Sequence, residues 1–148
     1  MEEGVSGSLL KGILKTFQGE PKDVRTYSPL TLAYIGDAVY DLIIRTVVVE
    51  RANRPAGRLH HMTAQYVSAR AQARIVQALE ENFTEEEQAI YRRGKNAKPH
   101  TMAKNASSAD YMRATGLEAV IGYLYLTDRL DRGLELVEMG IRQAEFQI

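Results

Sequence analysis

Cysteine is absent from this sequence of 148 residues, and histidine occurs only three times. Without cysteine the chain has no disulfide, no thiolate metal site and no cysteine nucleophile. Three scattered histidines also argue against a structural zinc site. A metal ion bound by this chain would therefore have oxygen ligands, which favours Mg²⁺, with Mn²⁺ as a substitute.

Long apolar runs are missing as well. No stretch reaches the roughly 18 to 20 apolar residues that cross a bilayer, and the acidic start at residues 1–4 lacks the basic region of a signal peptide. We therefore expect a cytoplasmic protein with no membrane partner. The length, with 45% hydrophobic and 26% charged residues, fits one globular domain.

The net charge is zero, but the charges are segregated along the chain. Residues 51–79 contain five arginines and no acid, and residues 88–109 contain five more basic residues and no acid. An acidic block lies between them, made of Glu80, Glu81, Glu85, Glu86 and Glu87. Such segregation produces a strong local positive potential and favours a polyanionic ligand. The alternative for each segment is an ordinary solvated face.

Apolar residues recur at helical spacing through most of the chain, and no stretch alternates with the period of a strand. The sequence therefore predicts an all-α helical bundle. We expect a short amphipathic helix over residues 6–17, within an N-terminal extension 1–27, which docks on the domain's own core rather than on a membrane. Proline at position 29, after Ser28, is typical of a helix start. Further helices are expected at 30–51, 58–82, 84–93, 108–126 and 131–146, with an exposed basic loop at 94–108.

Two of these helices carry an acid where apolar and small residues dominate. The helix over 30–51, which we expect to be the buried centre of the domain, has Asp37 beside Gly36. The helix over 108–126 has Glu118, with Gly122 one turn later. Small residues allow helices to approach closely, so the two carboxylates are predicted to meet.

Two carboxylates forced together repel each other unless a divalent cation lies between them. Asp41, one turn after Asp37, is a further candidate for such a cluster. The alternative is that each acid is buried and neutralised by an arginine such as Arg45 or Arg113. The two acids together, with a basic loop just upstream of Glu118, favour metal-assisted phosphodiester chemistry.

At these residues the sequence resembles a known family. Residues 32–39 (LAYIGDAV), with 117–126 (LEAVIGYLYL) downstream, resemble the ribonuclease III catalytic domain. Residues 93–98 (RGKNAK) and the compact length resemble its Mini-ribonuclease III (Mini-III) branch. The resemblance implies that residues 28–148 form an all-α endonuclease domain. It also implies a homodimer across the helix over 30–51, and Mg²⁺-dependent cleavage of double-stranded RNA.

The same resemblance assigns Asp37 and Glu118 as catalytic residues and metal ligands. The family usually has two more acids, at the positions occupied here by Ala33 and Thr115, and the Mini-III branch shares both departures. Asp41 and Thr115 are therefore auxiliary candidates. The Mini-III branch points to maturation of precursor large-subunit (23S) ribosomal RNA. The alternatives are a catalytically impaired double-stranded-RNA-binding module and a helical interaction protein with no role in RNA metabolism.

Only 30 residues follow Glu118, so no separate double-stranded-RNA-binding domain is expected after the catalytic domain. The catalytic domain itself must then hold the RNA, through its two basic segments. The candidate RNA-binding residues in these segments are Arg70, Arg74, Arg92, Arg93, Lys95, Asn96, Lys98 and Lys104.

Overall fold

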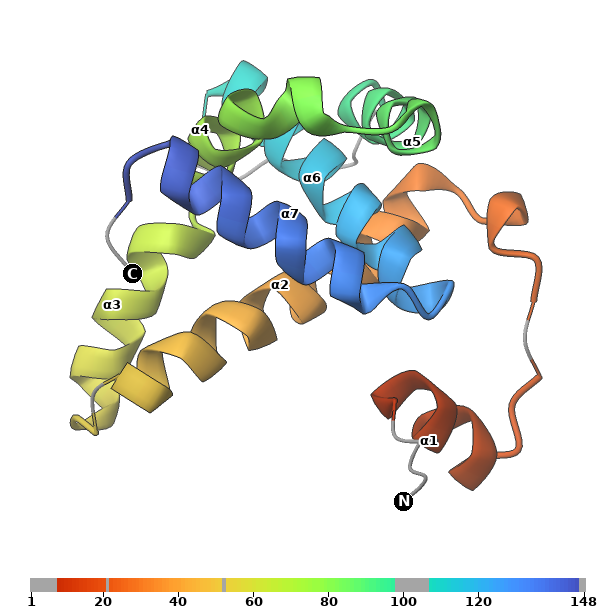
Figure 1. Ribbon diagram of the computed structural model, residues 1–148, viewed down its shortest axis with the longest axis horizontal. Helices are drawn as coiled ribbons and strands as arrows, with labels where there is room; N and C mark the ends of the chain where they lie inside the picture. Colours follow the sequence, from red (N-terminus) through yellow and green to blue (C-terminus); the bar gives the residue numbers. More distant parts are fainter. Residues whose placement is uncertain (1–7, 21, 52, 98–106, 147–148) are drawn as a thin grey trace.

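The computed structural model describes residues 8–20, 22–51, 53–97 and 107–146, and all regular structure in these ranges is helical. The expected all-α fold is confirmed (Figure 1). Two short 3-10 turns occur, at Val24–Thr26 and Glu80–Asn82. The α-helices are, in chain order, α1 (Leu9–Thr16), α2 (Pro29–Arg51), α3 (Ala56–Val67), α4 (Ala69–Leu79), α5 (Glu85–Lys95), α6 (Ser108–Leu126) and α7 (Leu130–Gln143).

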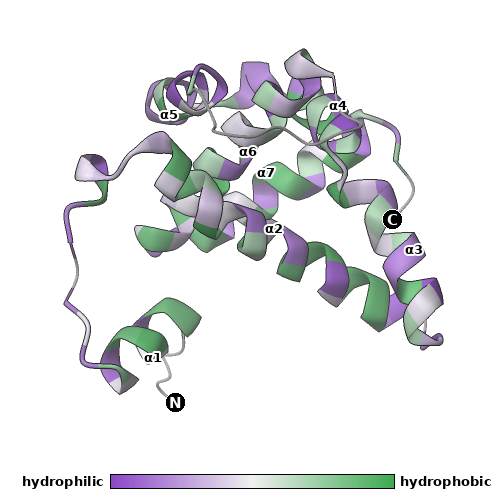
Figure 2. Cartoon of the chain, turned by 180° about the vertical axis from the view of Figure 1, so that it is seen from behind, coloured by the Kyte–Doolittle hydropathy of each residue, from purple (hydrophilic) through white to green (hydrophobic). Residues whose placement is uncertain are grey.

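Helix α6 is the centre of the domain. It packs against α2, α4, α5 and α7, and every residue from 114 to 125 is buried except the partly buried Glu118. The prediction that the helix over 30–51 forms the buried centre is wrong. Helix α2 buries only one face, because no described element covers the other, where Tyr34, Leu42 and Val49 are 82%, 53% and 56% exposed. Figure 2 shows α2 as a largely apolar helix along the edge of the body.

The single helix expected over residues 58–82 is interrupted at Ser68, which separates two helices. Ser68 is extended (φ −65°, ψ 155°), so that α3 ends at Val67 and α4 begins at Ala69. The Ser68 hydroxyl accepts a hydrogen bond from the Ala71 N–H at 3.2 Å. A serine side chain that binds a backbone N–H in this way caps a new helix and competes with continuation of the old one.

The other helix starts follow the capping residues in the sequence. The Ser28 hydroxyl accepts from the Thr31 N–H at 3.1 Å at the start of α2. Thr84 and Glu87 form a reciprocal capping box at the start of α5. Ser107 caps helix α6, and its hydroxyl accepts from the Asp110 N–H at 3.0 Å. Most of the expected basic loop, residues 98–106, lies outside the described residues.

Helix α1 docks on the core of the domain as expected, but only part of its apolar face is in contact. Leu10 is buried and Leu14 packs against the core, while Phe17 is 79% exposed. An ion pair of 3.5 Å between Lys11 and Asp128 joins α1 to the turn after α6. An extended connector leads from α1 to α2 (Figure 1). Among the described residues, no helix combines the length and the apolarity that a membrane crossing requires.

Candidate active site

Two glycines allow α2 and α6 to cross with their backbones in contact. A Cβ atom added at Gly36 would lie 1.7 Å from the Glu118 carbonyl oxygen, and one added at Gly122 would lie 2.0 Å from the Leu32 carbonyl oxygen. Neither position therefore accepts a side chain without separating the helices. The crossing brings the residue after Gly36, Asp37, next to Glu118, as the sequence predicted.

The electrostatics of Glu118 reflect this proximity. The pKa of Glu118 is raised to about 8. Burial is the largest cause, the negative charge of Asp37 and a hydrogen bond between the two carboxyl groups add to it, and a hydrogen bond from Gln72 opposes it. Asp37 itself is exposed. Glu118 therefore carries a proton at neutral pH unless a cation replaces that proton.

Tyr40 is fully buried and lies near enough to Glu118 to feel its charge. Burial and the nearby charge of Glu118 raise the pKa of Tyr40 far above its ordinary value, and its hydroxyl donates to the Tyr66 carbonyl oxygen at 2.7 Å. Tyr40 therefore stays neutral and does not add a second negative charge beside Glu118.

Asp37 and Glu118 form a donor set that fits Mg²⁺. Within the described ranges neither carboxylate is paired with an arginine, and no group of three or more His, Cys, Asp or Glu residues is placed to hold a metal. Mg²⁺ commonly binds through one or two carboxylates, with water and substrate phosphate as its remaining ligands. A divalent cation would also remove the repulsion that raises the Glu118 pKa.

The two auxiliary candidates have other partners. The Asp41 carboxylate forms an ion pair of 2.7 Å with Arg45, one turn later on α2. The Thr115 hydroxyl donates to the Tyr111 carbonyl oxygen at 2.9 Å, on its own helix. Ala33, at the other position where the family usually has an acid, is buried. An auxiliary role for Asp41 or Thr115 in metal binding stays a prediction.

Gln72 is a residue of the site that the sequence analysis missed. It is 2% exposed, and its Nε2 donates to Glu118 Oε2 at 3.2 Å and to the Val67 carbonyl oxygen at 3.0 Å. One signal for its burial is present in the sequence. Gln72 lies four residues before Val76 and seven before Leu79, in the row of α4 that faces the core.

The candidate RNA-binding residues lie on α4 and α5. Arg70, Arg92 and Arg93 are exposed. Arg74 has structural contacts, because its guanidinium donates to the Ala144 carbonyl oxygen at 2.8 Å and lies over the ring of Phe146. The remaining candidates are Lys95, whose ammonium lies 5.7 Å from the centre of the Tyr91 ring, Asn96, which ends α5, and Lys98 and Lys104, which lie outside the described residues.

Comparison with known proteins gives consistent matches. The family described as Ribonuclease III domain matches residues 30–129. The chain is 44% identical over 124 residues to Mini-ribonuclease 3 of Enterococcus faecalis, covering 82% of this chain and 94% of that protein. It is 42% identical over 145 residues to Mini-ribonuclease 3 of a Thermoanaerobacter species, covering 98% and 99%. The crystal structure of protein FN1578 from Fusobacterium nucleatum superposes with a TM-score of 0.73 at 31% identity, covering 82% of this chain and 97% of that one.

Proposed function

We propose that this chain, which belongs to the ribonuclease III family and is an endoribonuclease of that type, cleaves double-stranded RNA. In this proposal the enzyme is a homodimer and depends on Mg²⁺. The observation that carries the proposal is the pair Asp37 and Glu118, which meet at the crossing of α2 and α6 without an arginine to neutralise them among the described residues. The two carboxyl groups cannot both ionise at this crossing without cost, and a divalent cation in place of the Glu118 proton would remove that cost.

In this proposal Asp37 and Glu118 hold the cation, and Mn²⁺ can take the place of Mg²⁺. When bound, the cation supplies Lewis-acid chemistry, which activates water as the nucleophile and stabilises the negative charge of the leaving 3′ oxygen. Glu118 must lose its proton before it can act as a ligand. The backbone contact at Gly36 and Gly122 fixes the separation of the two carboxylates.

The basic residues of α4 and α5, with Lys98 and Lys104 beyond the described part of the chain, would contact the phosphates of an RNA duplex. Binding of this kind depends on duplex shape and 2′-hydroxyl groups rather than on base sequence. Replacing one exposed contact residue, for example Arg92→Ala, should weaken binding to any duplex equally. It should also reduce the slope of log affinity against log salt by about one unit.

The exposed face of α2 is the proposed dimer interface. Leu42 and Val49 are 53% and 56% exposed there. Apolar side chains gathered on one face favour burial against a partner subunit. Sedimentation should give a dimer for the wild type and a monomer for Leu42→Asp. A wild-type chain that sediments as a monomer at all concentrations would contradict the homodimer.

For the substrate we propose a cytoplasmic precursor of large-subunit (23S) ribosomal RNA. This rests on the resemblance to the Mini-III branch and on the match to proteins named Mini-ribonuclease 3. Cleavage of a structured precursor transcript, compared with a random duplex of equal length, tests it. Equal rates on both RNAs would contradict a dedicated ribosomal RNA substrate.

The decisive experiment uses a labelled RNA duplex with Mg²⁺ or with EDTA. We expect cleavage by the wild type only with Mg²⁺, and duplex binding without cleavage by Asp37→Asn and Glu118→Gln. Glu138→Gln is the matched control, because Glu138 is an exposed acid of α7 that is paired with Arg142. Full cleavage by either site variant would overturn the assignment. Binding without cleavage by the wild type in Mg²⁺ and in Mn²⁺ would favour the RNA-binding module instead.

A further inference from the structure

The side chain of Gln72 occupies an unusual position for a polar group. It is almost completely buried, and its Oε1 atom has no hydrogen-bond partner. Buried polar atoms without a partner are rare in folded proteins, and each needs an explanation. An apolar side chain of similar shape would fill the same space without this cost. Packing therefore does not explain a glutamine here.

The orientation of the Gln72 amide follows from its neighbours. The Val67 carbonyl oxygen and Glu118 Oε2 are both acceptors, so the amide nitrogen must face both of them, at 3.0 Å and 3.2 Å. This arrangement turns Oε1 away from both acceptors. The amide is thereby fixed between one backbone atom and one carboxylate of the site.

The break at Ser68 creates the backbone half of this arrangement. In an uninterrupted helix the Ala71 N–H would donate to the Val67 carbonyl oxygen. Here the Ala71 N–H donates to the Ser68 hydroxyl instead, and the Val67 carbonyl accepts from Gln72. The end of α3 therefore serves as a fixed anchor for a side chain of α4, which in turn holds a side chain of α6.

We propose that Gln72 is a positioning residue, which holds the Glu118 carboxylate in the orientation that binds the metal ion. This inference rests on the proposed metal site of Asp37 and Glu118. Residues that orient metal ligands through hydrogen bonds commonly change metal affinity or activity by about 10- to 100-fold when they are replaced.

The test is Gln72→Met, which keeps the length of the side chain and removes the amide donor. Mn²⁺ binding to the protein without RNA is measured by electron paramagnetic resonance, and cleavage is measured as a function of Mg²⁺ concentration. We expect Mn²⁺ affinity to fall by about 10- to 100-fold. We also expect a lower kcat at a given Mg²⁺ concentration, with an unchanged KM for RNA and unchanged duplex binding in EDTA.

Two control variants separate positioning from a general loss of stability. Gln77→Met makes the same chemical change at an exposed site of α4, and Ile75→Val removes a methyl group from the buried face of α4. Both should bind Mn²⁺ like the wild type, although Ile75→Val lowers Tm. If Gln72→Met does not fold, Gln72→Asn keeps the amide with a shorter reach, and should show the same loss of Mn²⁺ affinity.

The outcomes distinguish the inference from the proposed function. If a folded Gln72 variant bound Mn²⁺ as tightly as the unmodified protein, the positioning role would be overturned. This holds whether or not the unmodified protein cleaves RNA. Failure of the wild type to bind Mn²⁺, or full cleavage by Asp37→Asn, would overturn the metal site itself. Weakened Mn²⁺ binding by Ile75→Val to the same degree as by Gln72→Met would also overturn the inference, since stability alone would then explain the effect.

Discussion

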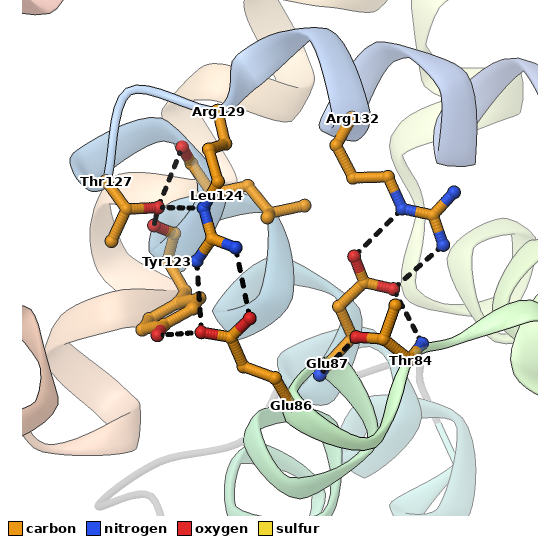
Figure 3. A network of polar contacts seen from close by, with 8 residues as sticks. All are labelled: Thr84, Glu86, Glu87, Tyr123, Leu124, Thr127, Arg129 and Arg132. Atoms are coloured by element: carbon orange, nitrogen blue, oxygen red, sulfur yellow. Dashed lines mark hydrogen bonds and ion pairs between the residues drawn. The ribbon is translucent and has the colours of Figure 1, made fainter.

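Two sets of acidic side chains lie along helix α6, one where it crosses α2 and one where it meets the start of α5. They differ in whether an arginine neutralises them. At the crossing with α2, Asp37 and Glu118 lie together, and the pKa of Glu118 is raised to about 8 by burial and by Asp37. At the start of α5, Glu86 and Glu87 each have an arginine from the segment after α6 (Figure 3). Among the described residues no arginine neutralises the first pair, whereas the chain itself neutralises the second.

Glu87 shows the contrast most clearly, because only 3% of its surface is exposed, whereas Glu118 is partly exposed. Burial would raise the pKa of Glu87, but hydrogen bonds from Arg132 and from the Thr84 N–H outweigh it and hold that pKa below its ordinary value. Figure 3 shows the Arg132 guanidinium facing both carboxylate oxygens of Glu87, each contact being 2.9 Å. Burial alone therefore does not distinguish the two sets. They differ in whether the chain supplies a counter-charge.

The largest effect is expected from Gly36→Ala, which attacks the contact that forms the first pair. The added methyl group would overlap the Glu118 carbonyl oxygen, so α2 and α6 must separate. We expect a loss of at least about 4 kcal/mol in the free energy of unfolding, measured by urea titration. Gly57→Ala is the control, because a Cβ there meets no atom within 4 Å. A Gly36→Ala chain as stable as the wild type would show that backbone contact does not hold the first pair together.

The next largest effect is expected from Arg132→Met, which leaves the Glu87 carboxylate buried without its counter-charge. Removal of one partner from a buried ion pair costs about 3 kcal/mol or more. Arg132 also donates to the Asn82 carbonyl oxygen at 2.9 Å, so part of the loss belongs to that contact. Cleavage per folded molecule should be unchanged, since Arg132 lies outside the candidate active site. If Arg132→Met kept full stability but lost cleavage, the ion pair of Glu87 would have a role in activity and not only in folding.

The pH dependence of stability should have opposite signs for the two sets. The folded-state pKa of Glu118 is raised, so the folded chain binds more protons than the unfolded one between about pH 4.5 and 8. This contribution is complete below the unfolded pKa and is lost as the pH rises through about 8. Glu87 has a lowered pKa, so its contribution is present above its unfolded pKa and is lost as the pH falls into the acid range.

Urea titrations in EDTA from pH 5 to 8.5 measure the first of these effects. The free energy of unfolding of the wild type should fall by about 2 kcal/mol more than that of Glu118→Gln over this range. The figure is below the full value for such a pKa shift because Glu118 is only partly buried, so that solvent screens part of the effect. Under the proposed metal site, Mg²⁺ should reverse the trend, since it would bind the deprotonated pair. Parallel profiles for the two proteins would contradict the raised Glu118 pKa.

The first pair was predictable from the sequence, because its signal is local. Asp37 and Glu118 are each an acid in an apolar helix with glycine nearby, and glycine marks where two helices approach. The buried centre of the fold was not predictable in the same way. Helices α2 and α6 are similarly apolar, and only the tertiary arrangement decides that α6 is enclosed while α2 keeps an open face.

The break at Ser68 and the role of Gln72 were missed for a related reason. Serine in the middle of an apolar pattern gives no clear stop signal without a neighbouring glycine or proline, and its capping hydrogen bond exists only once the helix has ended. The arginine partners of Glu86 and Glu87 lie 43 and 45 residues away along the chain. The sequence shows these acids only as suitable for the start of α5, where they do lie.

The smallest effect is expected at Glu86. Like Glu87 it is paired with an arginine, but unlike Glu87 it is exposed, so it tests whether pairing without burial contributes to stability. Arg129 donates to both Glu86 oxygens, at 3.0 and 3.1 Å, but both side chains are nearly half exposed. Exposed ion pairs contribute less than about 1 kcal/mol, and salt screens them. A double-mutant cycle of Glu86→Gln and Arg129→Met should therefore give a coupling free energy of about 0.5 kcal/mol at low salt, which falls further in high salt. A coupling above about 2 kcal/mol, unaffected by salt, would place Glu86 with Glu87 as a structural ion pair despite its exposure.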